Sequence, residues 1–229
     1  MKNFLSKIWN KLNRRSRKSD FGTVPKSYIK KFLPRNPVIV EAGAHIGIDT
    51  LEMAKIWPSG VIYAFEPIPH LFSQLEINTR NIKNIKCFPI ALSHTTGSST
   101  MYVSGGSSDG SSSILSPKEH LKEHPDVEFS KTIQVNTITL DFWAKKHGIA
   151  HIDFLWLDIQ GHELSVLKAA QNILKTIRAI YTEVHLVESY EGGALYPELR
   201  SWLESHNIRV EREALPWPDG GNVLFVNPL

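Results

Sequence analysis

Two short apolar runs in the first third of the chain each end in a carboxylate. Residues 38–40 run into Glu41, which is followed by Gly43 and Gly47, and residues 61–65 run into Glu66. An apolar run that ends in an acid and two glycines is typical of a buried parallel strand, a tight turn and a helix start. Open α/β sheets bind nucleosides at the carboxyl ends of such strands. The two acids are therefore candidates for holding a nucleoside-containing ligand.

The spacing of the glycines and acids narrows the choice of ligand. A dinucleotide site uses Gly-x-Gly-x-x-Gly and a helix N-terminus that faces a pyrophosphate, whereas this chain has Gly43-x-x-x-Gly47. Glu41, just before the turn, would repel a pyrophosphate but would suit the ammonium and sulfonium groups of S-adenosylmethionine. Glu66 would accept hydrogen bonds from the ribose hydroxyls. The pattern predicts an S-adenosylmethionine site and disfavours an NAD-dependent oxidoreductase or epimerase.

A second group of polar residues follows two later apolar runs. Residues 152–157 lead to Asp158 and then to His162 at a predicted helix start, and residues 178–182 lead to Glu183 and His185. Methyl transfer to a hydroxyl needs alignment and a group that accepts the proton. All four side chains are catalytic candidates, and the sequence does not choose among them. They could also converge on a divalent metal ion, although their spacing matches no specific metal signature.

These residues need a framework of alternating strands and helices to bring them together. Apolar patterns predict strands at residues 38–42, 61–65, 85–89, 152–157, 178–184, 207–212 and 222–227. They predict helices at residues 47–57, 68–80, 137–147, 162–176 and 194–206. Such alternation indicates a doubly wound α/β domain. We expect a Rossmann-like, class I methyltransferase type of fold, with a seven-stranded, mostly parallel sheet and helices on both faces.

A serine- and glycine-rich tract at residues 104–113 lies between the two halves of this pattern. Residues 100–103 and 132–135 on either side are typical of additional strands. The tract has too few apolar side chains to pack by itself, and long loops of this kind often act as lids or binding loops. We expect a mobile loop beside the site, with a surface insertion that has no role as the alternative.

The positive charge of the chain is concentrated at its N-terminus. The net charge is +3, but residues 1–35 hold eleven Lys or Arg and one acid, Asp20. Phe4, Leu5, Ile8 and Trp9 recur there at helical spacing with Leu12, and lysines lie between them. This pattern predicts a basic amphipathic arm at residues 1–35, whose first 20 residues could lie on an anionic membrane surface. The alternative is a helix that packs on its own domain or a frayed basic tail. Nucleic-acid binding is disfavoured because residues 36–229 are acidic.

The chain has no signal-peptide pattern and no apolar stretch long enough to span a membrane. Its single cysteine, Cys87, cannot form an internal disulfide, which fits a reducing compartment. Cys87 lies in an apolar run, and we interpret it as a buried small hydrophobe. The expected location is therefore the cytoplasm, with peripheral attachment to the inner membrane surface as a hypothesis that depends on the arm.

Together these segments resemble the FkbM family of S-adenosylmethionine-dependent methyltransferases over roughly residues 36–210. The matching pieces lie at residues 41–47, 63–67, 75–78, 91–93, 139–141 and 152–163. The most specific are Ala-Phe-Glu-Pro at residues 64–67 and Asp-Ile-Gln-Gly-His-Glu at residues 158–163. The resemblance implies methyl transfer, commonly to a hydroxyl oxygen of a sugar, polyketide or other natural product.

The resemblance also implies roles for particular positions. Residues 41–47 would line the methionine part of the cofactor, Glu66 the ribose, residues 91–92 the adenine, and Asp158 the methyl-transfer region. The full set expected to contact the cofactor is Glu41, Gly43, Ala44, His45, Gly47, Glu66, Pro67, Ala91, Leu92 and Asp158. This chain departs from the family at two positions, because the family often has Asn in place of His45 and Glu in place of Gln160.

We therefore expect an S-adenosylmethionine-dependent O-methyltransferase that acts on a hydroxyl of a saccharide, glycolipid or natural product. An NAD-dependent enzyme and a non-catalytic binding protein on the same fold remain as alternatives. The acceptor is a small molecule or a glycan, and acceptor pockets are built from variable loops that sequence patterns do not identify. A homo-oligomer formed through an exposed edge strand near the C-terminus stays open.

Overall fold

The structure is a computed structural model that describes residues 22–228. The predicted amphipathic segment, residues 1–20, lies outside the described residues. Within the described part, residues 24–33 pack against the sheet through Val24 and Ile29, which are buried. No helix between residues 22 and 228 is long and apolar enough to cross a membrane.

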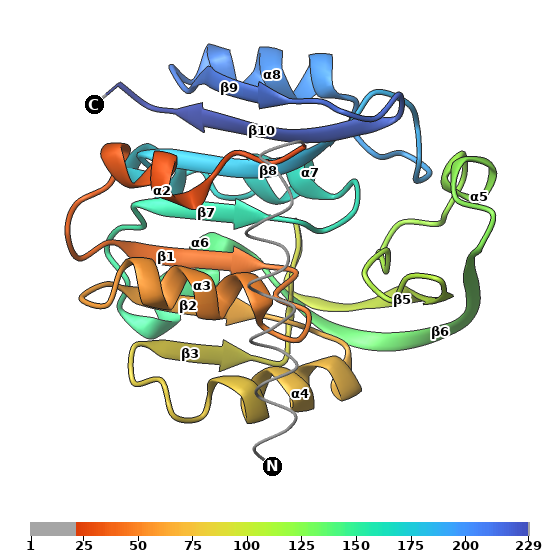
Figure 1. Cartoon of the computed structure of the whole chain (residues 1–229), viewed down its shortest axis with the longest axis horizontal. Coiled ribbons are helices and arrows are strands. Elements are labelled where there is room, and N and C mark those ends of the chain that lie inside the picture. Colours follow the sequence, from red (N-terminus) through yellow and green to blue (C-terminus); the bar gives the residue numbers. More distant parts are fainter. Residues whose placement is uncertain (1–21, 229) are drawn as a thin grey trace.

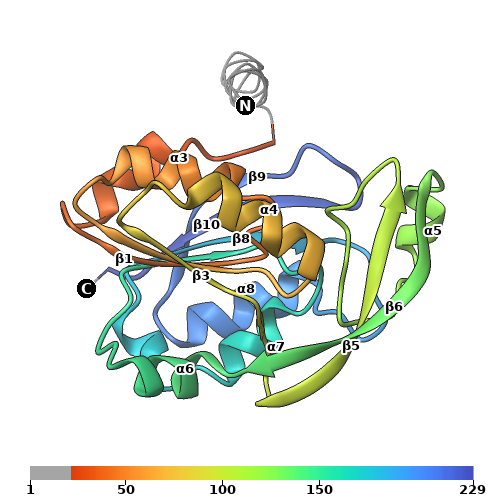
Figure 2. The ribbon, with the colours of Figure 1, turned by 90° about the horizontal axis from the view of Figure 1, so that it is seen from below.

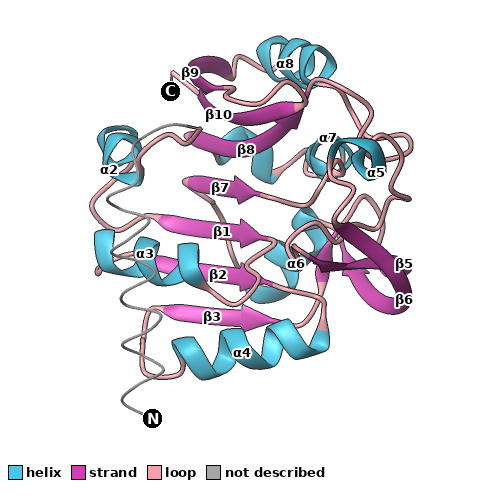
Figure 3. Ribbon diagram, turned by 45° about the vertical axis from the view of Figure 1, so that its right-hand side comes forward, coloured by secondary structure: helices cyan, strands magenta, loops and turns pink. Residues whose placement is uncertain are grey.

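A seven-stranded sheet forms the body of the molecule (Figures 1 and 3). Five parallel strands come first in spatial order: β3 (Ile85–Phe88), β2 (Val61–Phe65), β1 (Val38–Ala42), β7 (Phe154–Leu157) and β8 (Ala179–His185). The sheet then continues with β10 (Gly220–Val226), which is antiparallel to both of its neighbours, and ends with β9 (Arg209–Ala214). The predicted seven-stranded, mostly parallel sheet is confirmed. β9 lies at the edge of the sheet, and pairing with a second copy there stays a prediction.

Helices cover both faces of this sheet, as Figure 2 shows. One face carries α2 (Lys26–Ile29), the 3₁₀ helix η1 (Lys30–Phe32), α3 (Ile48–Ile56) and α4 (Pro69–Thr79). The other carries α6 (Leu140–His147), α7 (Glu163–Lys168), the 3₁₀ helix η2 (Ile173–Thr176) and α8 (Tyr196–Ser205). Phe154 and Trp156 pack towards the first face, and Leu155 and Leu157 pack towards the second. β7 is thus buried on both sides, as expected for a central parallel strand.

A second sheet of three strands stands beside the carboxyl ends of the parallel strands (Figure 3). Its order is β4 (Ala91–Leu92), β6 (Val127–Ile138) and β5 (Gly97–Gly106), and the short helix α5 (His120–Glu123) joins β5 to β6. The two additional strands that the sequence predicted are confirmed and are longer than expected. The expectation of a loop over residues 104–113 is wrong for residues 104–106, because β5 pairs with β6 as far as Gly106 and Val127.

Two predicted helices begin or end elsewhere in the structure. The helix expected at residues 137–147 begins at Leu140, because residues 137–138 pair in β6 and the Thr139 hydroxyl accepts a hydrogen bond from the Phe142 amide. The helix expected at residues 162–176 stops after Lys168. The Asp141 carboxylate accepts the backbone N–H groups of Asn172 and Ile173 at 3.0 and 2.9 Å, which holds that segment out of α-helical geometry. Cys87 is half-buried beside Ala64 and Leu75.

Candidate active site

A cavity of about 400 Å³ opens at the carboxyl ends of β1, β2 and β7. This volume lies within the usual range for small-molecule sites. The chain passes from β1 to β2 on one side and later places β7 on the other side, so the cavity lies at the switch point where doubly wound sheets bind ligands. It is lined by the loop after β1, the end of β2, residues 90–92, parts of residues 108–114 and the loop after β7.

The turn after β1 requires glycine at two positions. Gly43 has φ +83°, and a Cβ atom there would lie 1.9 Å from the Asp158 carbonyl oxygen. Gly47 has φ +85°, and its Cβ would lie 2.7 Å from the Leu75 side chain. Both values exclude a side chain, since left-handed backbone and close approach each favour glycine. Gly43 lets the ends of β1 and β7 meet, which brings Asp158 to the cavity.

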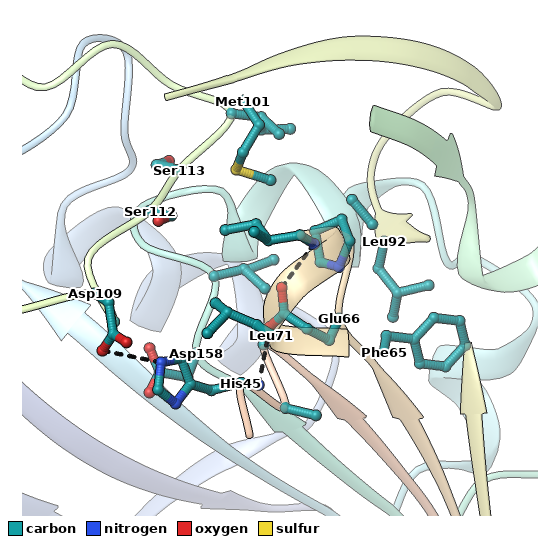
Figure 4. A pocket seen from close by; sticks show the side chains of 18 of the residues that line it. His45, Phe65, Glu66, Leu71, Leu92, Met101, Asp109, Ser112, Ser113 and Asp158 are labelled. Carbon is teal, nitrogen blue, oxygen red and sulfur yellow. Dashed lines mark hydrogen bonds and ion pairs between the residues drawn. The ribbon is translucent and has the colours of Figure 1, made fainter. Parts of the chain in front are cut away.

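Glu66 is buried at the end of β2 and faces the cavity (Figure 4). Its Oε2 accepts the His45 amide at 2.9 Å, and its Oε1 accepts the Ile68 amide at 2.8 Å. Burial raises the pKa of Glu66 to about 7, although the two amide donors lower it. A carboxylate has about four acceptor sites, so two remain for a ligand.

Glu41 does not line the cavity. It is buried on the α3 side of the sheet, where Oε2 accepts the Thr50 hydroxyl at 2.5 Å. Burial, with the nearby Asp49 carboxylate, raises the pKa of Glu41 to about 8. Asp49 lines the cavity instead and forms an ion pair with Lys26 at 2.7 Å. The sequence pointed to an acid near this position, and the structure places Asp49 rather than Glu41 at the cavity.

Asp158 and Glu183 are brought together, as expected from neighbouring strand ends. Asp158 is exposed to the cavity, while Glu183 is half-buried and lies outside the lining. Gln160 Nε2 lies 2.8 Å from Asp158 Oδ1 and 2.5 Å from Glu183 Oε2. Burial raises the pKa of both carboxyl groups, and burial together with the neighbouring Asp158 holds the pKa of Glu183 well above its ordinary value.

The two predicted histidines lie apart from this carboxyl pair. His162 is buried at the cavity wall, with Nε2 3.2 Å from the Ser93 hydroxyl and 3.4 Å from His94 Nδ1. His185 lies outside the lining and packs edge-on against the Tyr190 ring. Burial lowers the pKa of each imidazole to about 4. Within residues 22–228, neither histidine forms a hydrogen bond with Asp158.

Most of the expected cofactor residues do line the cavity: Gly43, Ala44, His45, Glu66, Pro67, Ala91, Leu92 and Asp158. Glu41 and Gly47 do not. The apolar side chains at one end were not predicted, and they include Phe65, Leu71, Ile90 and Met101. Phe65 could have been found as the last apolar residue of the second strand. Leu71 lies in the first turns of the predicted helix at residues 68–80 and faces back to the strand ends.

The serine-rich tract contributes a wall of the cavity through Ser108, Asp109, Gly110, Ser112 and Ser113. Asp109 lies 3.1 Å from His45 Nε2, a pair that Figure 4 shows at the opposite side of the cavity from Phe65. The Ser113 hydroxyl donates to the Gln160 carbonyl at 2.8 Å. The sequence indicated that this tract could be a binding loop, but it gave no signal for these individual partners.

The four side chains considered as metal ligands, Asp158, His162, Glu183 and His185, do not form a cluster. Among residues 22–228, the group with metal-like spacing is a different one, Glu123, His124 and Asp219, which lies at the surface between α5 and β10.

Residues 41–210 match the profile of the methyltransferase FkbM domain. The chain therefore belongs to the FkbM methyltransferase family. It is 33% identical over 199 residues to the 2-O-methyltransferase NoeI of Sinorhizobium fredii (strain NBRC 101917 / NGR234), which covers 84% of this chain and 80% of NoeI. It is 26% identical over 211 residues to methyltransferase sdnD of Sordaria araneosa, with 82% and 80% covered.

Solved methyltransferase structures share the fold of this family member. The FkbM methyltransferase from Methylobacillus flagellatus KT superimposes with a TM-score of 0.54 and 14% identity, over 83% of this chain and 44% of that chain. M. capricolum TrmK, solved with S-adenosylhomocysteine, gives a TM-score of 0.50 and 11% identity, over 88% and 67%. The protein is thus a class I, S-adenosylmethionine-dependent methyltransferase, and the alternatives of an NAD-dependent enzyme and a non-catalytic binding protein are set aside.

The cavity residues fit this cofactor. Asp49, Asp109 and Asp158 present carboxylates to the cavity, which suits a ligand that carries sulfonium and ammonium groups. The same carboxylates would repel a pyrophosphate. Glu66 keeps free acceptor sites at the end of β2, and the apolar residues beyond it provide a surface for a purine ring.

Proposed function

We propose that this FkbM-family methyltransferase transfers a methyl group from S-adenosylmethionine to a hydroxyl oxygen of a saccharide, glycolipid or other natural product. The name of NoeI specifies 2-O-methyl transfer, and this relationship supports an oxygen acceptor. Within the site, the observation that carries the proposal is Asp158, whose carboxyl group is exposed to the cavity at the end of β7. A carboxylate in that place can accept a hydroxyl proton during the transfer.

The ends of the cavity have different roles in this proposal. Glu66 accepts hydrogen bonds from the ribose hydroxyls, because its free acceptor sites face the cavity. Phe65, Leu71 and Leu92 contact the adenine ring. Gly43 to His45, with Asp49, surround the methionine part, where Asp49 attracts the ammonium group in place of the predicted Glu41.

Asp158 is the catalytic base in this proposal, and the other three candidates act elsewhere. When bound, S-adenosylmethionine supplies an electrophilic methyl group on a sulfonium, whose positive charge the Asp158 carboxylate stabilises. His162 is buried against Ser93 and His94 and so helps to form the wall of the adenine end. His185 and Glu183 do not reach the cavity themselves.

Calorimetric titration tests the cofactor and its contact with Glu66. We expect S-adenosylmethionine and S-adenosylhomocysteine to bind, NAD not to bind, and Glu66→Ala to weaken both adenosyl ligands at least tenfold. Glu76→Ala, an exposed acid on α4, is the matched control and should leave affinity unchanged. Binding of NAD, or no binding of either adenosyl ligand to the wild type, would contradict the proposal.

The acceptor class requires a separate experiment. The protein is incubated with S-adenosylmethionine and a panel of methyl glycosides in which each hydroxyl in turn is replaced by hydrogen. Mass spectrometry detects the product because replacing a hydroxyl hydrogen by a methyl group adds about 14 mass units. Loss of product with one deoxy compound alone would identify the oxygen, whereas methylation of every deoxy compound and of amines would count against an O-methyltransferase.

The N-terminal arm has its own proposed role at an anionic membrane surface. Residues 1–20 supply lysines and arginines between apolar residues, and each basic residue near such a surface contributes about 1 kcal/mol. We expect the full chain to co-sediment with vesicles that contain phosphatidylglycerol, and added salt to weaken binding. The chain without residues 1–20 should stay in the supernatant, and unchanged co-sedimentation of that variant would refute this role.

A further inference from the structure

The most constrained side chain near the site is Gln160, which the function described so far does not use. Its single Nε2 atom serves both carboxyls, with Asp158 Oδ1 at 2.8 Å and Glu183 Oε2 at 2.5 Å. An amide nitrogen carries two protons, one for each carboxyl group. Asp158 and Glu183 therefore lie beside each other, since one nitrogen atom is within hydrogen-bond distance of both carboxyl groups.

A second contact, on the oxygen side, fixes the orientation of the Gln160 side-chain amide. Tyr190 is fully buried, and its hydroxyl lies 2.8 Å from Gln160 Oε1 and 2.8 Å from the Ser111 carbonyl oxygen. The tyrosine hydroxyl has one proton for these two oxygens, and with Oε1 as an acceptor of that proton the Nε2 atom of Gln160 faces the carboxyl groups. Gln160 also has φ +56°, a left-handed conformation that is costly for a residue with a side chain. Such strain persists only where several contacts determine it, and it is frequent at functional sites.

Two neighbouring carboxyl groups that share one amide nitrogen favour a proton on one of them, because two ionised carboxylates have only acceptors and repel each other. The other groups that influence the pair include Asp49, Glu163, Asp219, His45 and Tyr190. Three of these are acids, and none is a lysine or arginine. Like charges in a partly desolvated place favour one ionised and one neutral carboxyl group.

We propose that Asp158 and Glu183 share one proton, held on Glu183, and act as a singly charged pair that accepts the proton of the acceptor hydroxyl. This inference rests on the proposed O-methyl transfer. The acceptor oxygen forms a bond to the methyl carbon while the carbon–sulfur bond breaks and leaves its electron pair on sulfur. The hydroxyl proton moves to Asp158, so that both carboxyls are then neutral. Asp158 returns the proton to water through the open cavity.

The buried site gives Asp158 a more suitable basicity than an exposed aspartate would have. An isolated Asp has a pKa of about 3.9, so it is a weak base at neutral pH. Burial raises the pKa of Asp158, as does the nearby Asp49 carboxylate, although Gln160 and Glu183 lower it. The net rise moves the pKa of Asp158 towards the operating pH, where a general base is most effective. Gln160 and Tyr190 are positioning residues, because they hold the pair but do not reach the acceptor.

Infrared difference spectroscopy tests the shared proton directly. A protonated carboxyl group absorbs separately from a carboxylate, and the wild type is compared with Glu183→Gln at pH 7, without cofactor. We expect the variant to lose the intensity of one protonated carboxyl group. Glu188→Gln, at an exposed acid paired with Lys118, is the matched control and should lose none. If Glu183→Gln also loses none, Glu183 is ionised and the proposal is wrong.

Ligand charge provides a second readout that does not depend on the acceptor. S-adenosylmethionine carries a sulfonium charge that S-adenosylhomocysteine lacks, so the ratio of their affinities reports the charge of the pair. We expect Asp158→Asn to lower this ratio about tenfold and Glu183→Gln to leave it within about twofold. An equal fall in both variants means that both carboxyls are ionised and overturns the proposal. If the wild type binds neither ligand, the proposed function fails instead.

Tyr190→Phe tests positioning, since it removes the hydroxyl that fixes the amide. We expect the pH profile of methyl transfer to move by about one pH unit while the affinity for S-adenosylhomocysteine stays within threefold. A profile that does not move, in a variant that folds and binds, would show that Tyr190 has only a structural role and would refute its part in the pair.

Discussion

Glu66 and Asp158 follow the two strands that flank β1, and both face the same cavity, yet their partners differ. Glu66 accepts two backbone amides, one on each carboxyl oxygen, so its orientation is fixed by main-chain geometry. Asp158 has side-chain partners, Gln160 and Glu183, and its neighbours are mostly acids. The difference between main-chain and side-chain partners separates a fixed hydrogen-bond acceptor from a group suited to exchange a proton.

The side chains that surround Glu66 and Asp158 also differ. Figure 4 shows Glu66 between the apolar Phe65 and Leu92 on one side and the group of His45, Asp109 and Asp158 on the other. An apolar end with one fixed acceptor suits a purine nucleoside. An acidic end suits the cationic part of the cofactor and the transferred methyl group. In the proposed function, the cavity thus binds the nucleoside at one end and holds the reacting groups at the other.

The largest expected difference between Asp158 and Glu66 is in how their substitution affects the rate of methyl transfer. Asp158→Asn removes the proton acceptor, and the loss of a general base typically costs about 10²–10⁴ in rate. We expect kcat to fall by at least about a hundredfold, while the affinity for S-adenosylhomocysteine changes less than about threefold. His162→Asn is the matched control at the adenine wall and should retain most of kcat. A greater loss from His162→Asn than from Asp158→Asn would reverse the assignment.

Gly43→Ala should affect both acids together, because it disturbs the contact between β1 and β7. The new Cβ would lie 1.9 Å from the Asp158 carbonyl oxygen. We expect a loss of about 2–5 kcal/mol in the free energy of unfolding, as for severe clashes with backbone. Gly192→Ala, at φ +71° with nothing within 4 Å, isolates the cost of the conformation and should lose only about 1 kcal/mol. Equal losses in denaturant titrations would show that the contact is unimportant.

The arrangement of strands and strand-end acids was predictable because it follows from short stretches of sequence. The order of strands, the two glycines of the first turn and the acid after each strand all follow from runs of five to ten residues. The place of Glu41 was not predictable in the same way. Successive side chains of a strand point to opposite faces, so the position of the turn decides which acid enters the cavity. Here the strand directs Glu41 to Thr50, and Asp49 of α3 takes the place at the cavity.

The partners of the remaining site residues come from distant loops without periodic patterns. Asp109 meets His45, and Tyr190 meets Gln160, across segments whose packing depends on the second sheet. A pattern of serines and glycines indicates a loop but does not specify what each side chain will contact. The four catalytic candidates could therefore be named from the sequence and their roles stay predictions, whereas the grouping of Asp158 with Glu183, and of His162 with Ser93, needed the fold.

A third carboxyl group, Glu41, differs from the two cavity acids because its protonation affects the stability of the fold. Its pKa is about 8 in the folded protein and about 4.5 in the unfolded chain, so the folded state holds the proton more tightly. Its contribution is complete below pH 4.5 and is lost as the pH rises through 8. We expect the free energy of unfolding to fall by about 1–3 kcal/mol between pH 5 and pH 8.5.

The measurement is a series of urea titrations across this pH range. Glu41→Gln should flatten the dependence, because a neutral amide cannot ionise, while the Thr50 hydroxyl still has an acceptor. Glu52→Gln, at an acid on the exposed side of α3, is the control and should keep the slope. An unchanged slope in Glu41→Gln would mean that Glu41 is already ionised at neutral pH and does not differ from the cavity acids in this way.

Glu66→Gln should have a smaller effect, confined to binding. The variant keeps one acceptor oxygen, so one of the two backbone amides loses its acceptor. It also loses the charge that strengthens hydrogen bonds from the ribose hydroxyls, and we expect a change of about 1.5 kcal/mol or tenfold in Kd. We expect kcat to stay within about threefold of the wild type. The pH dependence gives a further check. Affinity should weaken below pH 7 in the wild type, where Glu66 becomes protonated, and should stay constant in the variant.

The smallest expected effect is that of the pair between His45 and Asp109, which joins the turn after β1 to the serine-rich wall. Both side chains are partly exposed, at 31% and 60%, so their attraction is screened and contributes at most about 1 kcal/mol. We expect Asp109→Asn to weaken S-adenosylmethionine by two- to fourfold and to make its affinity less sensitive to salt. Asp126→Asn, in the turn before β6, should change neither quantity. A loss of tenfold or more in Asp109→Asn would instead indicate that Asp109 contacts the cationic end of the cofactor directly, which would extend the acidic end of the cavity from Asp158 to the tract itself.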